Sequence, residues 1–157
     1  MDKHTFKWKG DLYYLIGIDK HGRPAYLQQA SFDCNWYWGL GYIETFTNKK
    51  NPHLSRDITS HRHFDRLVLT YDGKNDVYDR FKQEFPETPL TTNEIWELLE
   101  LMQTAYTCRH YSDMLYTGGA HLTPNPLKPI IQNEEEYNRI NKDVIPDIMM
   151  KVYELLS

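Results

Sequence analysis

The sequence predicts an α+β fold in which an N-terminal antiparallel sheet, arranged as a meander, packs against two to three C-terminal α-helices. Residues 5–47 contain short runs rich in aromatic and β-branched residues, separated by turn signals, which is typical of strands. From about residue 75 the apolar residues recur every three or four positions, which is typical of amphipathic helices. Because strands precede helices instead of alternating with them, a doubly wound parallel sheet is disfavoured.

The expected strands lie in the first part of the chain. The first three comprise residues 6–9, 12–18 and 25–32. The loop at residues 19–24 makes the last two a hairpin, and the spacing of all three fits an antiparallel meander. A further strand is expected within residues 36–46, where Gly39 and Gly41 indicate a bulge or a close backbone approach.

The expected helices follow in the second half. They are residues 76–85, 92–117 and 134–156. Thr91 and Glu94 have the spacing of a capping box before the second helix, and Asn133 and Glu136 have it before the third. Pro146 lies inside the apolar pattern of the third helix, so we expect a kink there.

The length of 157 residues fits one domain, so we expect residues 1–157 to form a single α+β domain, strand-rich over 5–47 and helix-rich over 75–157. The only cysteines, Cys34 and Cys108, have no CxxC spacing, which fits free thiols in a reducing compartment. No apolar run has the length of a signal peptide at the N-terminus or of a membrane span elsewhere. The sequence therefore predicts a cytoplasmic protein without a membrane partner.

The composition restricts the classes of partner. The formal net charge is −4, so direct nucleic-acid binding is not expected, because phosphate binding needs a basic surface. The chain is acidic, most strongly over residues 72–100, and aromatic residues make up 14% of it. Such a composition fits either an ordinary core and solvated surface or a surface that binds a protein.

The run Ser60-His61-Arg62-His63-Phe64-Asp65 is the segment that most suggests chemistry. On a strand, His61, His63 and Asp65 would share one face, and two imidazoles with a carboxylate can bind zinc. The run resembles the HxHxD motif of metallo-β-lactamase-like hydrolases, but Arg66 stands where that family has a further histidine. The alternative is a structural role, with these side chains hydrogen-bonded inside the fold.

Two other groups of residues are candidate binding sites. The apolar stripe of the long helix reaches Arg109 and its neighbour His110, and His121 follows a Gly-Gly pair. This arrangement predicts one of two things. Either Arg109 holds an anion in a polar pocket, or Arg109 forms an ordinary ion pair with Asp113 on the same helix face. The aromatic run Trp36-Tyr37-Trp38 cannot face one core as a strand, so it indicates either a protein interface or packing beneath the helices.

Catalytic motifs are missing from the sequence, since it contains no GxGxxG, GxxxxGK[ST], GxSxG or HExxH. Three segments, Trp38–Glu44, Ser60–Asp65 and Leu90–Leu99, are similar to segments of small proteins of unknown function that phages and prophages encode. The resemblance transfers no catalytic residues. It implies an accessory protein that binds and blocks a host protein, including host defence systems such as CRISPR effectors.

We therefore expect a non-enzymatic phage or mobile-element accessory protein that binds and inhibits a host protein in the host cytoplasm, with anti-CRISPR activity as one form of this role. No catalytic residue and no cofactor belong to this expectation. The alternative is a metal-dependent hydrolase or metal-binding protein in which His61, His63 and Asp65 hold zinc. Metal content separates the two, because a metal site that exists only in the folded state must stabilise it.

Overall fold

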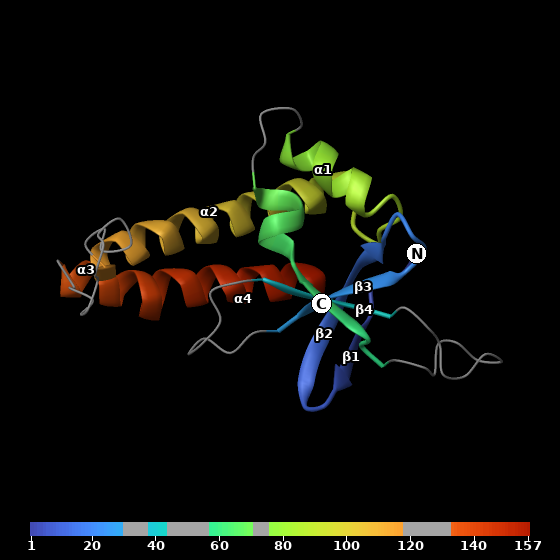
Figure 1. Ribbon diagram of the computed structural model, residues 1–157, viewed down its shortest axis with the longest axis horizontal. Helices are drawn as coiled ribbons and strands as arrows, with labels where there is room; N and C mark the ends of the chain where they lie inside the picture. Colours follow the sequence, from blue (N-terminus) through green and yellow to red (C-terminus); the bar gives the residue numbers. More distant parts are fainter. Residues whose placement is uncertain (30–37, 44–56, 71–75, 118–132) are drawn as a thin grey trace, which may run out of the picture. The chain divides into compact units, whose positions relative to one another are not determined.

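The computed structural model describes residues 1–29, 38–43, 57–70, 76–117 and 133–157. Its strands precede its helices along the chain, which confirms the expected α+β fold (Figure 1). The chain forms two compact units, one of residues 1–99 with 153–157 and the other of residues 100–152. The expectation of a single domain stays a prediction.

A five-stranded antiparallel sheet, with its strands in sequence order, is the framework of the first unit. The strands are β1 Thr5–Trp8, β2 Asp11–Ile18, β3 Pro24–Gln28, β4 Gly39–Tyr42 and β5 Ser60–His63. The expected meander is confirmed, and β5 extends it beyond residues 5–47. Gly22, in the turn between β2 and β3, has a φ of 82°, which only glycine adopts without strain.

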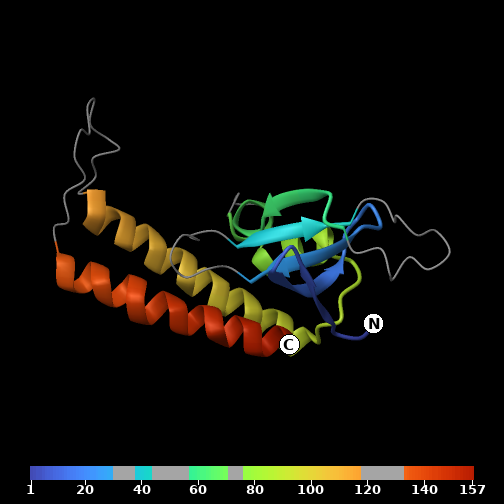
Figure 2. The same cartoon turned by 90° about the horizontal axis from the view of Figure 1, so that it is seen from below.

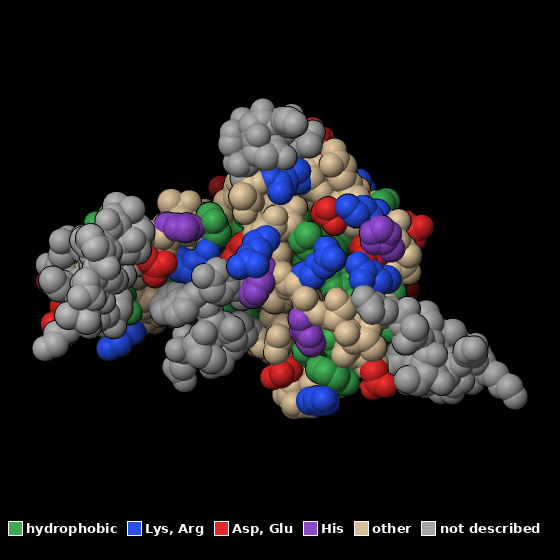
Figure 3. Space-filling model, viewed as in Figure 1, with side chains coloured by type: hydrophobic (Ala, Val, Ile, Leu, Met, Phe, Trp, Pro, Cys, Tyr) green, Lys and Arg blue, Asp and Glu red, His purple; other side chains and the backbone are tan. Residues whose placement is uncertain are grey.

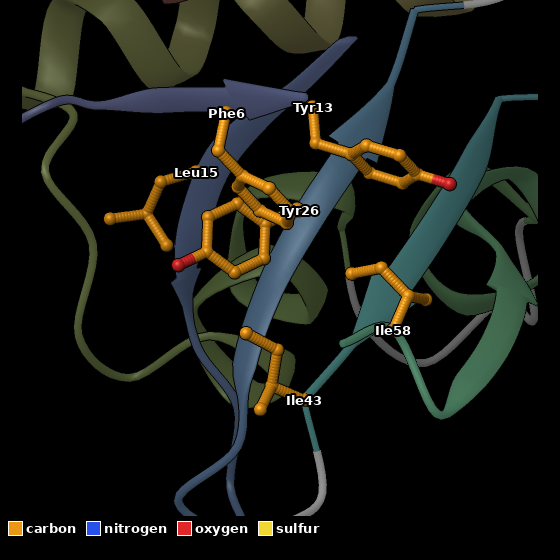
Figure 4. Close-up of a cluster of buried hydrophobic side chains, with 6 residues drawn as sticks. All are labelled: Phe6, Tyr13, Leu15, Tyr26, Ile43 and Ile58. Carbon is orange, nitrogen blue, oxygen red and sulfur yellow. The ribbon is translucent and has the colours of Figure 1, made fainter. Parts of the chain in front are cut away.

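Each face of the sheet buries aromatic side chains within the first unit. Side chains alternate along β2, so Tyr13 and Tyr14 point to opposite faces. One face holds a buried cluster, shown in Figure 4: Phe6, Tyr13, Leu15, Tyr26, Ile43 and Ile58. On the other face, Tyr14 stacks on Tyr153 of helix α4 (Ile145–Leu156), with ring centroids 5.4 Å apart.

Beyond β5 the chain forms a π-helical turn, η2 (Asp65–Leu69), and then helix α1 (Val77–Glu84). Phe64, Phe81 and Phe85 are fully buried at this junction. Their ring centroids lie between 5.2 and 6.5 Å apart, so they form one aromatic cluster. This cluster holds η2 against α1.

Helix α2 spans Thr92–Thr117, and its expected capping box is confirmed. Thr91 Oγ1 accepts the N–H of Glu94 at 3.2 Å, and Glu94 Oε1 accepts the N–H of Thr91 at 3.0 Å. These two bonds satisfy N–H groups that the first turn leaves without helical partners. The local sequence therefore determines where this helix begins.

The C-terminal helical segment contains α3 (Glu134–Arg139), a π-helical turn η4 (Ile140–Val144) and α4. Asn133 Oδ1 accepts the N–H of Glu136 at 3.1 Å, as expected for the start of this segment. The π-helical turn η4 ends two residues before Pro146, and the kink expected at this proline stays a prediction. In the second unit this segment runs beside α2 (Figures 1 and 2), and Asn141 Nδ2 donates to Ser112 Oγ.

Candidate functional site

Strand β5 is the last strand of the sheet and carries three exposed side chains, His61, Arg62 and His63. His61 and His63 lie on one face and Arg62 on the other, because side chains alternate along a strand. On the histidine face, the register partners on β4 are Gly41 and Gly39. Strand β4 therefore places no side chain of its own against either imidazole.

The two glycines of β4 differ in how tightly they are packed. A Cβ at Gly41 would lie 2.8 Å from Ile58 Cγ2 and 3.1 Å from Tyr13 Cε1, both in the buried cluster. The close backbone approach expected at Gly41 is therefore confirmed. At Gly39 the nearest atom to a Cβ would be Gln28 Oε1 at 3.4 Å, which is an ordinary contact.

The turn η2 is held by hydrogen bonds at its ends and at its centre. Thr70 donates to Asp65 O through its N–H and through its hydroxyl, each at 2.9 Å. Arg80 of α1 donates to the carbonyl oxygen of Leu67 at 3.3 Å. These bonds hold Arg66 and Leu67, which are central in the turn, beside the end of β5.

A pocket of about 310 Å³ lies between β5 and η2, and we call it the β5–η2 pocket. It is lined by His61, Arg62, His63, Arg66 and Leu67. Among the described residues that line it, none carries a carboxylate, and both guanidinium groups stay protonated at physiological pH. Figure 3 shows Lys, Arg and His side chains on the face seen there, with Asp and Glu side chains among them. The lining therefore favours an anion.

An aromatic surface continues from the pocket on the histidine face. The His61 ring centroid lies 6.1 Å from that of Trp8 on β1, and Lys9 Nζ lies 4.6 Å from the centre of the same indole. Strands β1 and β5 are the two ends of the sheet, so this contact requires a strongly curved sheet. The half-buried Trp8 thus adds apolar area next to the basic residues.

The three residues of the expected metal site do not come together. Strand β5 ends at His63, and Asp65 begins η2, so the expected common face of His61, His63 and Asp65 is wrong. Asp65 is 2% exposed, whereas both histidines are exposed. Within the described ranges, no group of three or more His, Cys, Asp or Glu residues could hold a metal ion.

The aromatic run expected to form an interface is described only at Trp38. Trp38 is 5% exposed and packs edge-to-face on Tyr153, with ring centroids 6.1 Å apart. This environment is that of a core residue, which was the alternative expectation for the run. Trp36 and Tyr37 lie outside the described residues.

The residues expected around Arg109 belong to the second unit. Arg109 is 5% exposed, and its guanidinium carbon lies 4.6 Å from the centre of the Tyr106 ring. His110 is exposed and packs edge-to-face on the same tyrosine, with centroids 4.4 Å apart. His121 lies outside the described residues, so the anion pocket expected at Arg109 stays a prediction.

Sequence reasoning missed three pocket residues, Arg62, Arg66 and Leu67. Arg62 lies inside the run that the sequence singled out, and Arg66 drew notice only as a departure from a metal motif. The available signal was the concentration of two arginines and two histidines within residues 61–66. Two arginines in such a run indicate anion binding, because guanidinium groups do not ligate zinc.

Comparison with family models, with curated proteins and with solved structures found no match to this chain. None of the helices in the described ranges combines the length and the apolar character that crossing a bilayer requires. The arguments about function therefore depend on the residues of the chain itself.

Proposed function

We propose that this protein is a non-enzymatic binding protein that holds an acidic segment of a partner protein in the β5–η2 pocket. The observation that supports this most is the lining, in which two arginines and two histidines surround one space. Arginine binds carboxylates through paired, planar hydrogen bonds and does not exchange protons near neutral pH. A binding role fits such a lining better than proton transfer does.

A protein segment fits the pocket better than a nucleic-acid strand does. Nucleic-acid binding needs a basic stripe that contacts several phosphates, whereas the basic lining here is confined to residues 61–66 of a chain with net charge −4. Leu67 in the lining and Trp8 beside it add the apolar area that side chains of a peptide bury.

We further propose a host protein as the partner, the host cytoplasm as the compartment and inhibition as the outcome. Support for this part comes from the resemblance to small phage and prophage proteins and from the acidic, aromatic-rich composition. A CRISPR effector is one host protein of this kind. A partner that presents an acidic, extended segment is the one to test first.

The proposal is tested by anisotropy of a fluorescein-labelled glutamate peptide of about twelve residues at low salt. Arg62→Glu combined with Arg66→Glu is expected to weaken binding at least about tenfold, because it reverses both fixed charges of the pocket. The matched control, Lys142→Glu with Lys151→Glu, makes the same change in net charge at two exposed positions of the second unit, outside the lining. This control is expected to change the affinity by less than about threefold.

Two results would overturn the proposal. Equal losses in the two double variants would mean that net charge, and not the pocket, attracts the peptide. A single-stranded oligonucleotide of about twelve nucleotides that binds the wild-type protein as tightly as the peptide would exclude a protein segment as the preferred ligand.

A further inference from the structure

We infer that the acidic segment binds as an extended strand that adds to the edge of β5, which pairs with no further strand among the described residues, and places its carboxylates in the β5–η2 pocket. This inference rests on the proposed function and specifies its binding mode. In strand addition, backbone hydrogen bonds supply affinity and side-chain pockets supply specificity. The register, the course of the pocket and the charges of β5 each support it.

The register determines which backbone groups of β5 point outward. The N–H of Phe64 donates to Trp38 O at 2.8 Å, so these two residues form a hydrogen-bonded pair across β4 and β5. Bonded and non-bonded pairs alternate along an antiparallel ladder, so Arg62 is bonded to Leu40 and His61 occupies a non-bonded position. The N–H and C=O of His61 therefore point away from β4, toward the edge of the sheet.

The pocket follows that edge. His61 and Arg62 are neighbours, so their side chains point to opposite faces of the sheet, and yet both line the same space. A pocket that touches both must pass along the edge of β5 and not over one face. Arg66 and Leu67 of η2 form the far wall. This turn is π-helical, a conformation that is frequent at functional sites.

The charges of β5 select an acidic strand. Two copies of this chain that paired through β5 would bring arginines and histidines together, and exposed charges of this kind protect edge strands from such self-pairing. An acidic strand is instead attracted, because its carboxylates are opposite in charge to the basic side chains of β5. Its side chains alternate between the two faces, where they find the imidazoles on one side and Arg62 on the other.

Two substitutions at one position separate strand addition from capture by side chains alone. His61→Ala and His61→Pro both remove the imidazole, but only proline removes the outward N–H, and an edge strand tolerates proline where that N–H has no ladder partner. The glutamate peptide is expected to bind His61→Pro about three- to tenfold more weakly than His61→Ala. Equal affinities would overturn strand addition and leave the proposed function intact, whereas no binding to the wild-type protein would overturn both.

Amide hydrogen exchange of the wild-type protein gives the same test without a proline variant. Saturating peptide is expected to slow exchange at the His61 amide at least about tenfold. The amide of Gln103 in α2 is the internal control, because it belongs to the second unit, which holds none of the residues that line the pocket. An unchanged His61 rate would overturn strand addition. Equal protection of the His61 amide by inorganic phosphate would also overturn strand addition, because it indicates a simple anion site. Protection that develops when the free protein is concentrated would overturn it as well, because it indicates self-pairing.

Discussion

Asp19 in the turn between β2 and β3 is expected to be a large local contributor to the stability of the sheet. It is 5% exposed. Its Oδ1 accepts the N–H groups of His21 at 2.9 Å and Arg23 at 2.7 Å, and its Oδ2 accepts Arg23 Nε at 2.8 Å. Asp19→Ala removes the acceptor for all three bonds, so the turn loses two side-chain bonds to backbone N–H groups and its ion pair, while the backbone bonds between Asp19 and both Gly22 and Arg23 remain.

The magnitude follows from the three bonds that Asp19 accepts. Each backbone N–H contributes about 1 kcal/mol and the guanidinium bond about 2 kcal/mol. His21 is exposed, so water can bond to its N–H once the Asp19 carboxylate is gone, and that bond is left out of the sum. The bonds to the N–H and the guanidinium of Arg23 remain in the sum, so the expected loss is about 3 kcal/mol. In a chain of this size that loss lowers the Tm by about 6–12 °C. Asp19→Asn keeps one oxygen for the two backbone N–H groups but replaces the oxygen that accepts Arg23 Nε by an NH2 group, so it is expected to lose about 2 kcal/mol, the bond to the guanidinium.

Urea denaturation followed by circular dichroism, at several pH values, measures both effects. Burial raises the pKa of the Asp19 carboxyl, but the hydrogen bonds and the charge of Arg23 outweigh burial, so the pKa lies below its ordinary value of 3.8. A pKa that is lower in the folded state stabilises the protein above the unfolded pKa, and this stabilisation is lost as the pH falls through the folded pKa. The stability difference between wild type and Asp19→Asn is therefore expected to be constant between about pH 7 and 5 and to shrink below about pH 4.

Two results would refute this reasoning. A difference between wild type and Asp19→Asn that stays constant down to about pH 3 would show that the carboxylate charge is not the stabilising group. A loss below about 1 kcal/mol for Asp19→Ala would show that water replaces all three bonds.

The remaining predictions concern β4 and the histidine pair. Gly41→Ala is expected to lower the free energy of unfolding by about 1–3 kcal/mol, because its Cβ would lie 2.8 Å from Ile58 Cγ2. Urea denaturation measures this, and an unchanged midpoint would contradict the tight packing. Zinc at about 100 µM is expected to shift the Tm of untagged protein by less than about 1 °C, because His61, His63 and Asp65 do not form a site. A rise of several degrees in differential scanning fluorimetry would restore the metal hypothesis.

The helices could be predicted from the sequence because their signals are local. The capping box that begins at Thr91 forms both of its expected hydrogen bonds, and Asn133 accepts the N–H of Glu136 as the N-cap of the last helical segment. The early strands could also be predicted, because the aromatic and β-branched residues in Leu12–Ile18 indicate a strand whatever it pairs with. In these segments local preference and tertiary environment agree.

Strand β5 and its pocket could not be predicted in the same way. Its four residues, Ser-His-Arg-His, lack the apolar alternation that identifies a strand, and pairing with β4 specifies it instead. Extending the strand period to Asp65 failed because Phe64 is buried among Phe81 and Phe85, and the chain turns there. The pocket exists because η2 returns Arg66 to the strand, which only the folded chain shows.

The unequal packing of the two β4 glycines makes the histidine side of the site open to engineering. Gly41 is constrained by the core, whereas position 39 has room for a side chain and its φ is not in the left-handed region. In a non-bonded pair side chains approach closely, so a residue introduced at position 39 would stand directly against His63. Under the proposed binding mode, substitutions at this one position are expected to change the affinity for the glutamate peptide while the core keeps its packing.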